Sequence, residues 1–336
     1  MRTTAYAVIF GSFLAMNLLA ADQQLVNMVM PEAKVVAGIN VTSARNSPFG
    51  TFLLRHASAN NTDLQKFVEM TGFNPQTDLD EILVASPGAP AAPAEGAGLT
   101  AQGKLAAGPH VRGLILARGT FNVDKISGLA KTHGRQTMQN YNGAILISDP
   151  NNPVASAMAF VGTNIAVAGD LASVKAAIDR RTQANSLDPQ LTTKVNALSN
   201  SQDAWAVSIA PLSSINAGPA TDPTLQGALN GDIFKKITQT SGGIKFGSQI
   251  QVQTEMVAMD EKNATALGDV VRFLVGMVTM NAGNGKGAPP AIVSLLQSLS
   301  IQTQGNVVNL TVSAPEDQIE GLIDSMPEGK HGRSAI

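Results

Sequence analysis

Cysteine is absent from the 336-residue chain, which excludes disulfides, thiolate nucleophiles, cysteine zinc sites and a lipidated N-terminal cysteine. Aromatic residues make up only 4%, with Trp205 the sole tryptophan, so a platform on which bases or sugars stack is not expected. Charged residues make up 14%, and 23 Lys and Arg against 25 Asp and Glu leave a formal net charge of −2. A nucleic-acid partner is therefore not expected either, because it requires a dense basic face. What remains is a chain that is 44% hydrophobic, enough for a sizeable core.

The N-terminus reads as a signal peptide over residues 1–21. Arg2 supplies a short positive region, and the nearly continuous apolar run 5–20 has the length of a signal-peptide core. It is short for a membrane span, which needs about 20 residues. We predict cleavage after Ala20 or Ala21 and an extracytoplasmic location, in the periplasm or secreted, with no transmembrane span in the mature chain. The alternative is that the segment is retained as an anchor helix.

After the signal peptide the order of strand-like and helix-like segments occurs twice. Segments 34–41 and 203–210 open the two rounds, and the acid-capped helices at 171–181 and 315–326 close them. We therefore predict two similar domains, 22–200 and 201–330, followed by a tail at 331–336, with a Pro/Ala/Gly-rich loop at 87–109 inside the first. The alternative is two unrelated α+β domains. The remaining predicted strands are 81–86, 111–119, 143–148, 155–161, 164–168, 243–259, 300–305 and 306–313. The remaining predicted helices begin at Pro48 or span 63–70, 123–131, 189–198, 211–217, 225–237 and 263–280.

Adjacent predicted strands are joined by tight turns, such as Gly162-Thr163, and not by single helices in regular alternation. This order favours an α+β class, each half an antiparallel sheet with helices packed on one face, related to the ferredoxin-like motif.

One segment also carries a resemblance. The sequence GFNPQTDLD at 72–80 runs into the strand EILV at 81–84 and follows VVAGINV at 35–41. Over residues 31–179 this order is similar to uncharacterised exported bacterial α+β proteins with two similar halves. The resemblance implies a fold type and an extracytoplasmic setting, and it brings no catalytic residues.

Residues with catalytic chemistry are scarce. The chain has no G-x-S-x-G segment, and its four histidines are His56, His110, His133 and His331. His56 and His133 end predicted helices, where an imidazole meets the terminal carbonyl groups favourably. We therefore predict that the protein is not an enzyme and needs no cofactor. The rival is a hydrolase assembled from distant residues, with Asp78 or Asp80 beside His56 or His133.

Three carboxylates, Asp78, Asp80 and Glu81, lie within four positions and have the chemistry to hold a hard cation such as Ca²⁺. Successive residues entering a strand point to opposite faces, however, so we favour turn and cap roles and predict no metal site.

One helix stands out because most of its circumference is apolar. Between residues 267 and 280, Asp269 and Arg272 are the only charged residues, and Phe273, Met277 and Met280 extend the apolar stripe to a second face. Either the sheet and segment 291–299 cover both faces, or an exposed apolar surface binds a partner, a lipid or a second copy. Phe273, Met277 and Met280 are the candidate binding surface.

We therefore expect a non-catalytic exported binding or scaffold protein of the periplasm or cell envelope, which contacts an envelope protein or itself through this helix. The runner-up is a carrier of a small hydrophobic ligand held between sheet and helices.

Overall fold

The computed structural model describes residues 21–59, 62–88, 113–133, 136–149, 156–184, 186–211, 233–282 and 289–325. The predicted leader up to residue 20, nearly all of the loop 87–109, helix 211–217 after its first residue, most of helix 225–237 and the tail 331–336 lie outside the described residues.

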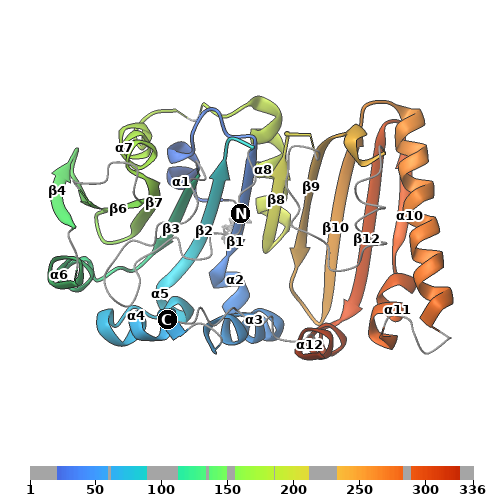
Figure 1. The fold of residues 1–336 in the computed structure, drawn as a ribbon, viewed down its shortest axis with the longest axis horizontal. Helices are drawn as coiled ribbons and strands as arrows, with labels where there is room; N and C mark the ends of the chain where they lie inside the picture. Colours follow the sequence, from blue (N-terminus) through green and yellow to red (C-terminus); the bar gives the residue numbers. More distant parts are fainter. Residues whose placement is uncertain are drawn as a thin grey trace, which may run out of the picture.

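Strands and helices alternate along the chain as follows (Figure 1). The strands are β1 (Val35–Asn40), β2 (Leu79–Ser86), β3 (Leu114–Gly119), β4 (Thr137–Tyr141), β5 (Ala144–Ser148), β6 (Ser156–Val161), β7 (Ile165–Asp170), β8 (Ala204–Ser208), β9 (Ile237–Lys245), β10 (Gln249–Ala258), β11 (Ser300–Gln304) and β12 (Val307–Pro315). The helices are α1 (Gln23–Met28), α2 (Val41–Arg45), α3 (Pro48–Ala59), α4 (Thr62–Thr71), α5 (Pro75–Asp78), α6 (Val123–His133), α7 (Leu171–Arg180), α8 (Pro189–Ser201), α10 (Glu261–Ala282), α11 (Pro290–Gln297), α12 (Glu316–Ser325) and the 3₁₀ turn η2 (Phe234–Lys236).

The strands of the described residues form one antiparallel sheet in the order β11-β12-β10-β9-β8-β1-β2-β3-β7-β6-β5-β4. The predicted α+β class with antiparallel strands is confirmed. Read outward from the centre, β1-β2-β3-β7-β6 and β8-β9-β10-β12-β11 follow the same order, and β5 and β4 extend the first set. The two sets join edge to edge through β1 and β8, so their strands share a single sheet. The domain boundary at residue 200 stays a prediction.

The seam between β1 and β8 is closely packed around Gly38, which lies opposite Trp205 on one side and Leu83 on the other. A Cβ atom at Gly38 would lie 2.6 Å from Trp205 Cζ2 and 2.7 Å from Leu83 Cδ2. Glycine is therefore required here by the close approach of the indole ring, which is buried.

One face of the sheet supports the largest core. Leu83, Leu114 and Leu116 are fully buried on this face, with Val36 and Trp205 beside them. They pack in one cluster with apolar side chains of α1, α7 and α8, such as Leu25, Ile178 and Leu191.

The opposite face of the sheet also carries apolar side chains, because in the first half both alternating sets of strand residues are apolar. Val123 and Ile126 of α6 pack there against Phe160 of β6. Helices therefore cover both faces of the first half, and not the one face that the strand order predicts. In the second half, α3 and α12 lie across one end of the strands, and α10 runs along β12 and the edge strand β11 (Figure 1).

Asp203, the residue directly before β8, connects this strand to α2 and to the end of β9 through its side chain. The side chain is 3% exposed. Its carboxylate accepts hydrogen bonds from the Phe246 backbone N–H at 2.7 Å, from Lys245 Nζ at 3.0 Å and from the Ser43 hydroxyl. Donors from α2, from the last residue of β9 and from the residue after it thus meet on one buried carboxylate.

Most predicted elements agree with the structure to within a few residues. The short helices α2, α5 and α11 were not predicted, and three further elements differ. Strand β4 was not predicted, because its sequence TMQNY is largely polar and forms an outer edge of the sheet. Helix α1 was not predicted either, and it directly follows the predicted signal peptide. Strand β9 begins at Ile237, six residues before the predicted strand start and at the end of the predicted helix 225–237. Within the described residues, no helix has the length and apolar content needed to cross a membrane.

Candidate functional site

Helix α10 is fixed to the sheet at its N-terminal end. Asp260 caps it, because its carboxylate accepts the backbone N–H of Asn263 at 2.8 Å. One turn later Ala264 and Leu267 are buried in a cluster with Val308 of β12. The first turns of α10 therefore belong to the core.

Beyond Gly268 the described side chains of α10 are no longer buried. Phe273 is 69% exposed and Met280 is 79% exposed, whereas Met277 is half-buried. Together with Met259, which directly precedes the helix and is 60% exposed, Phe273 and Met280 are the large apolar side chains most open to solvent in the described parts of the chain. The structure thus places the three candidate residues on one helix, two of them outward.

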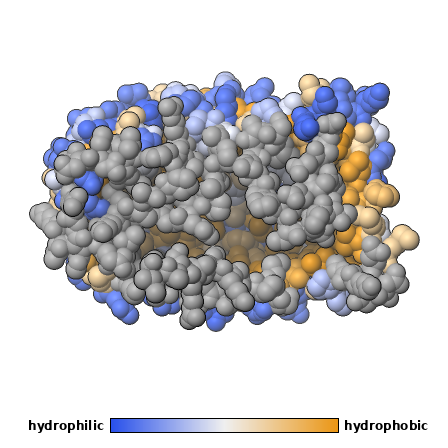
Figure 2. Space-filling view, in the orientation of Figure 1, coloured by the Kyte–Doolittle hydropathy of each residue, from blue (hydrophilic) through white to orange (hydrophobic). Residues whose placement is uncertain are grey.

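Helix α11 lies against α10 without covering this surface. It contacts α10, β12 and α12, yet every residue of α11 remains at least partly exposed. Figure 2 shows hydrophobic residues gathered on the side of the molecule where Figure 1 places α10 and α11. The coverage by segment 291–299 that a two-sided apolar helix predicts is therefore incomplete.

A separate pocket of about 710 Å³ opens at the other end of the sheet. Its apolar walls include Phe73 and Phe121, whose rings stack with centroids 5.4 Å apart, and Ile145. Asp78 and Asp124 are also among the residues that line it. The candidate residues of α10 are not among the residues that line it, and the sequence carried no signal for it because its walls come from four separate segments.

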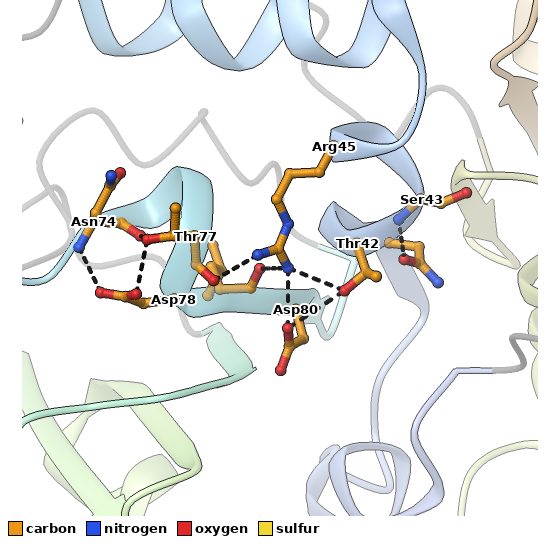
Figure 3. A network of polar contacts seen from close by, with 9 residues as sticks. Thr42, Ser43, Arg45, Asn74, Thr77, Asp78 and Asp80 are labelled. Carbon is orange, nitrogen blue, oxygen red and sulfur yellow. Dashed lines mark hydrogen bonds and ion pairs between the residues drawn. The ribbon is translucent and has the colours of Figure 1, made fainter.

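The three neighbouring carboxylates of the predicted turn are separated by the structure. Asp80 pairs with Arg45 of α2 at 3.0 Å, and the same guanidinium donates to the carbonyl oxygens of Thr77 and Leu79 (Figure 3). Asp78 accepts the Asn74 backbone N–H at 2.8 Å and the Thr77 hydroxyl at 2.8 Å. These contacts are the turn and cap roles that the sequence favours.

Glu81 lies on the other face of β2, toward α1. Its two carboxylate oxygens accept the backbone N–H of Asp22, at 3.0 and 3.3 Å. Burial raises the pKa of Glu81 from 4.5 to about 7; the Asp22 N–H and Arg118 oppose this rise, and the Asp22 carboxylate adds to it. No local sequence pattern predicts this contact, because Asp22 and Glu81 are 59 residues apart.

The residues of the rival hydrolase have structural partners. Asp78 and Asp80 are engaged as described above, and the His56 ring stacks on Phe52 with centroids 5.8 Å apart. His133 is the last residue of α6, and His110 and His331 lie outside the described residues. In the described ranges, His, Asp and Glu side chains do not gather in groups of three or more that could hold a metal ion.

Comparison with known proteins gives no family. No protein-family model matches the chain, and no curated protein matches it. Among solved structures, crystal form IV of TP0453 is similar with a TM-score of 0.48 and 7% identity, over 91% of this chain and 98% of that one. Crystal form I of TP0453 gives a TM-score of 0.44 and 8% identity over the same shares. These likenesses are too distant to transfer a function or a site.

Proposed function

We propose that this protein acts without catalysis, as an exported binding or scaffold protein of the periplasm or cell envelope that associates through helix α10. The observation that supports the proposal is the outward position of Phe273 and Met280 on a helix whose first turns are anchored in the core. Exposed apolar groups that gather on one rigid element are typical of interaction surfaces.

Phe273 and Met280 belong to a row of residues with the spacing of a helix-pairing seam. Val270 and Met277 of this row are partly buried, and Val270 also packs against the core. Ala266, Val270, Phe273, Met277 and Met280 alternate steps of four and three residues along α10. In this 4–3 repeat, apolar side chains insert into the spaces between side chains of a second helix. We call these five residues the α10 face. Its geometry fits an apolar helix better than an extended chain or a sugar.

The occupant that we propose is the α10 face of a second copy of this protein. Between residues 266 and 280 the charged side chains are Asp269 and Arg272, which pair with each other at 2.9 Å. Two copies of the face therefore meet without like-charge repulsion, which otherwise separates identical surfaces. The methionines adapt to an imperfect fit, since their side chains are flexible.

Such an association is expected to be weak and reversible. Complete burial of a large apolar side chain contributes about 1.5–3 kcal/mol. Phe273 is 69% and Met280 79% exposed, so covering the exposed parts of these four side chains in two copies contributes about 4–9 kcal/mol. Association itself costs at least about 4 kcal/mol. A dissociation constant between about 10 µM and 1 mM follows once the half-buried members of the face are included.

The test is the oligomeric state of the leader-free protein, measured by sedimentation velocity over about 10 µM to 1 mM. We expect a concentration-dependent dimer that the double substitution Phe273→Gln and Met280→Gln abolishes. Met259→Gln is the matched control, because this exposed methionine lies outside the α10 face. A wild-type protein that stays monomeric throughout, or a dimer that survives the double substitution, contradicts the proposal.

A second candidate function is the carriage of a small hydrophobic ligand, which the pocket of about 710 Å³ supports. This volume lies within the range of about 300–1,000 Å³ of small-molecule sites, and aromatic rings form part of its walls. Titration with a fluorescent apolar probe would test it. Binding that Phe73→Ala weakens, while the double substitution in the α10 face does not, would favour the carrier.

A further inference from the structure

The start of α1 is held by a small charged cluster. The Asp22 carboxylate accepts the N–H groups of Gln24 and Leu25 and so caps the helix. The same carboxylate pairs with Arg118 Nε of β3 at 2.5 Å. Glu81 of β2 approaches the backbone nitrogen of Asp22 with both oxygens. Contacts from α1, β2 and β3 therefore fix the position of the Asp22 backbone nitrogen.

The charges in this cluster do not balance. Asp22 brings one negative charge and Arg118 brings one positive charge, so an ionised Glu81 leaves the cluster with one unmatched negative charge. Because Arg118 already pairs with Asp22, the partner at Glu81 is an uncharged peptide N–H. A buried carboxylate facing only a neutral donor is unfavourable, and it is stabilised when a cation takes the place of that donor.

A single covalent change places a cation at this position. If the peptide bond between Ala21 and Asp22 is hydrolysed, water supplies a hydroxyl to the Ala21 carbonyl carbon and a proton to the Asp22 nitrogen. Ala21 then ends in a carboxylate and leaves with the leader, and the nitrogen becomes an α-ammonium group after taking up a further proton from solvent. The cluster would then hold two positive and two negative charges.

We propose that Glu81 is the receptor for the α-ammonium group of Asp22 in the processed protein, and that processing occurs between Ala21 and Asp22. The leader is removed during export, before the chain folds, so partial burial of Ala21 in the folded protein is no obstacle. Processing one residue earlier would place the ammonium group on Ala21, away from the nitrogen that Glu81 contacts. The contact thus distinguishes between two adjacent cleavage positions. The proposal shares only export with the proposed function and does not involve α10.

The first measurement is the intact mass of the protein recovered after export of the full chain. We expect a chain that begins at Asp22. A chain that begins at Ala21, or one that keeps Met1, overturns the proposed processing position whatever the oligomeric state of the protein.

The second measurement is the rate at which acetic anhydride acetylates the α-amino group near neutral pH. Pairing with a carboxylate raises the pKa of an amine, and each unit lowers the reactive free-amine fraction about tenfold. We expect acetylation about tenfold slower in the chain that begins at Asp22 than in one that keeps Ala21, whose amine lies one residue away. This comparison needs no substitution and so does not depend on how a variant folds.

Glu81→Gln in the chain that begins at Asp22 should restore the ordinary acetylation rate. Asp80→Asn, on the opposite face of the same strand, is the matched control and should leave the slow rate unchanged. Equal rates in the chains that begin at Asp22 and Ala21, or a slow rate that persists in Glu81→Gln, would refute a pairing between Glu81 and the ammonium group.

Discussion

Gly38→Ala places one methyl group in the seam where β1 meets β8. The new Cβ would lie 2.6 Å from Trp205 Cζ2 and 2.7 Å from Leu83 Cδ2, closer than carbon atoms approach without displacement. The indole ring is 6% exposed and the leucine is fully buried, so neither side chain has free space into which to move. The substitution therefore acts as overpacking at the centre of the sheet.

Two effects set the size of this change. Overpacking of a filled core costs about 1–3 kcal/mol, and clashes on two sides place Gly38 at the upper end of that range. Replacing glycine with alanine also restricts the unfolded chain, which returns about 0.4–1 kcal/mol. We expect the free energy of unfolding to fall by about 2 kcal/mol. Gly128→Ala in α6 is the matched control, because a Cβ there meets nothing within 4 Å. It should raise the free energy of unfolding by about 0.5–1 kcal/mol.

The assay is urea denaturation followed by both tryptophan fluorescence and far-ultraviolet circular dichroism. Trp205 is the sole tryptophan and lies at the seam, so its emission reports this junction directly. Coincident transitions by the two probes, shifted to lower urea in Gly38→Ala, are expected. A variant as stable as the wild type would show that the indole ring does not pack over Gly38.

Two further predictions concern buried carboxylates. Asp203→Asn should lower the free energy of unfolding by about 2–4 kcal/mol in urea denaturation, because the charged acceptor of Lys245 and of the Phe246 N–H is lost. Asp80→Asn, which breaks a pair that is half exposed on the Asp80 side, should cost less than about 1 kcal/mol, and equal losses at both positions would contradict the role of Asp203. In the chain that keeps its leader, burial raises the pKa of Glu81 from 4.5 to about 7, so the folded state retains a proton that the unfolded chain has released. The free energy of unfolding should therefore fall by about 3 kcal/mol as pH rises from 4.5 to about 7, and thermal unfolding of Glu81→Gln should lack this fall. A rise in stability over the same interval would reverse the sign and refute the assignment.

Local patterns in the sequence predict most single elements correctly, because their signals lie within a few residues. Asp170 is an example: the sequence predicts it as a helix cap, and its carboxylate accepts the Ser173 N–H at 2.9 Å. Pro189 likewise opens α8 as predicted, behind the capping residue Asp188. Strand β4 was not predicted, because an edge strand needs little apolar content and its sequence pattern then does not differ from that of a loop.

Long-range pairing was beyond the reach of these patterns. Nothing within VVAGIN or AWAVS specifies that the two strands pair with each other and merge two sets of strands into one sheet. The same limit applies to the candidate site. An apolar circumference predicts that α10 is either covered or binding, and only the position of α11 leaves Phe273 and Met280 outward. The contact between Glu81 and Asp22 also depends on strand placement, and the alternation of β2 indicates only which face Glu81 occupies.

The pairing of β1 with β8 also bears on how the nascent chain reaches its final state. In the proposed export the chain emerges from its N-terminus, so the strands from β1 to β7 have all emerged and can pair while β8 has not. During that interval β1 has β2 on one side and an unpaired row of N–H and C=O groups on the other. An open strand edge of this kind recruits other chains, and this one closes only when residues 204–208 emerge and pair across the seam. The strand at the centre of the finished sheet is thus, until β8 pairs with it, an open edge at which the partly folded chain can aggregate.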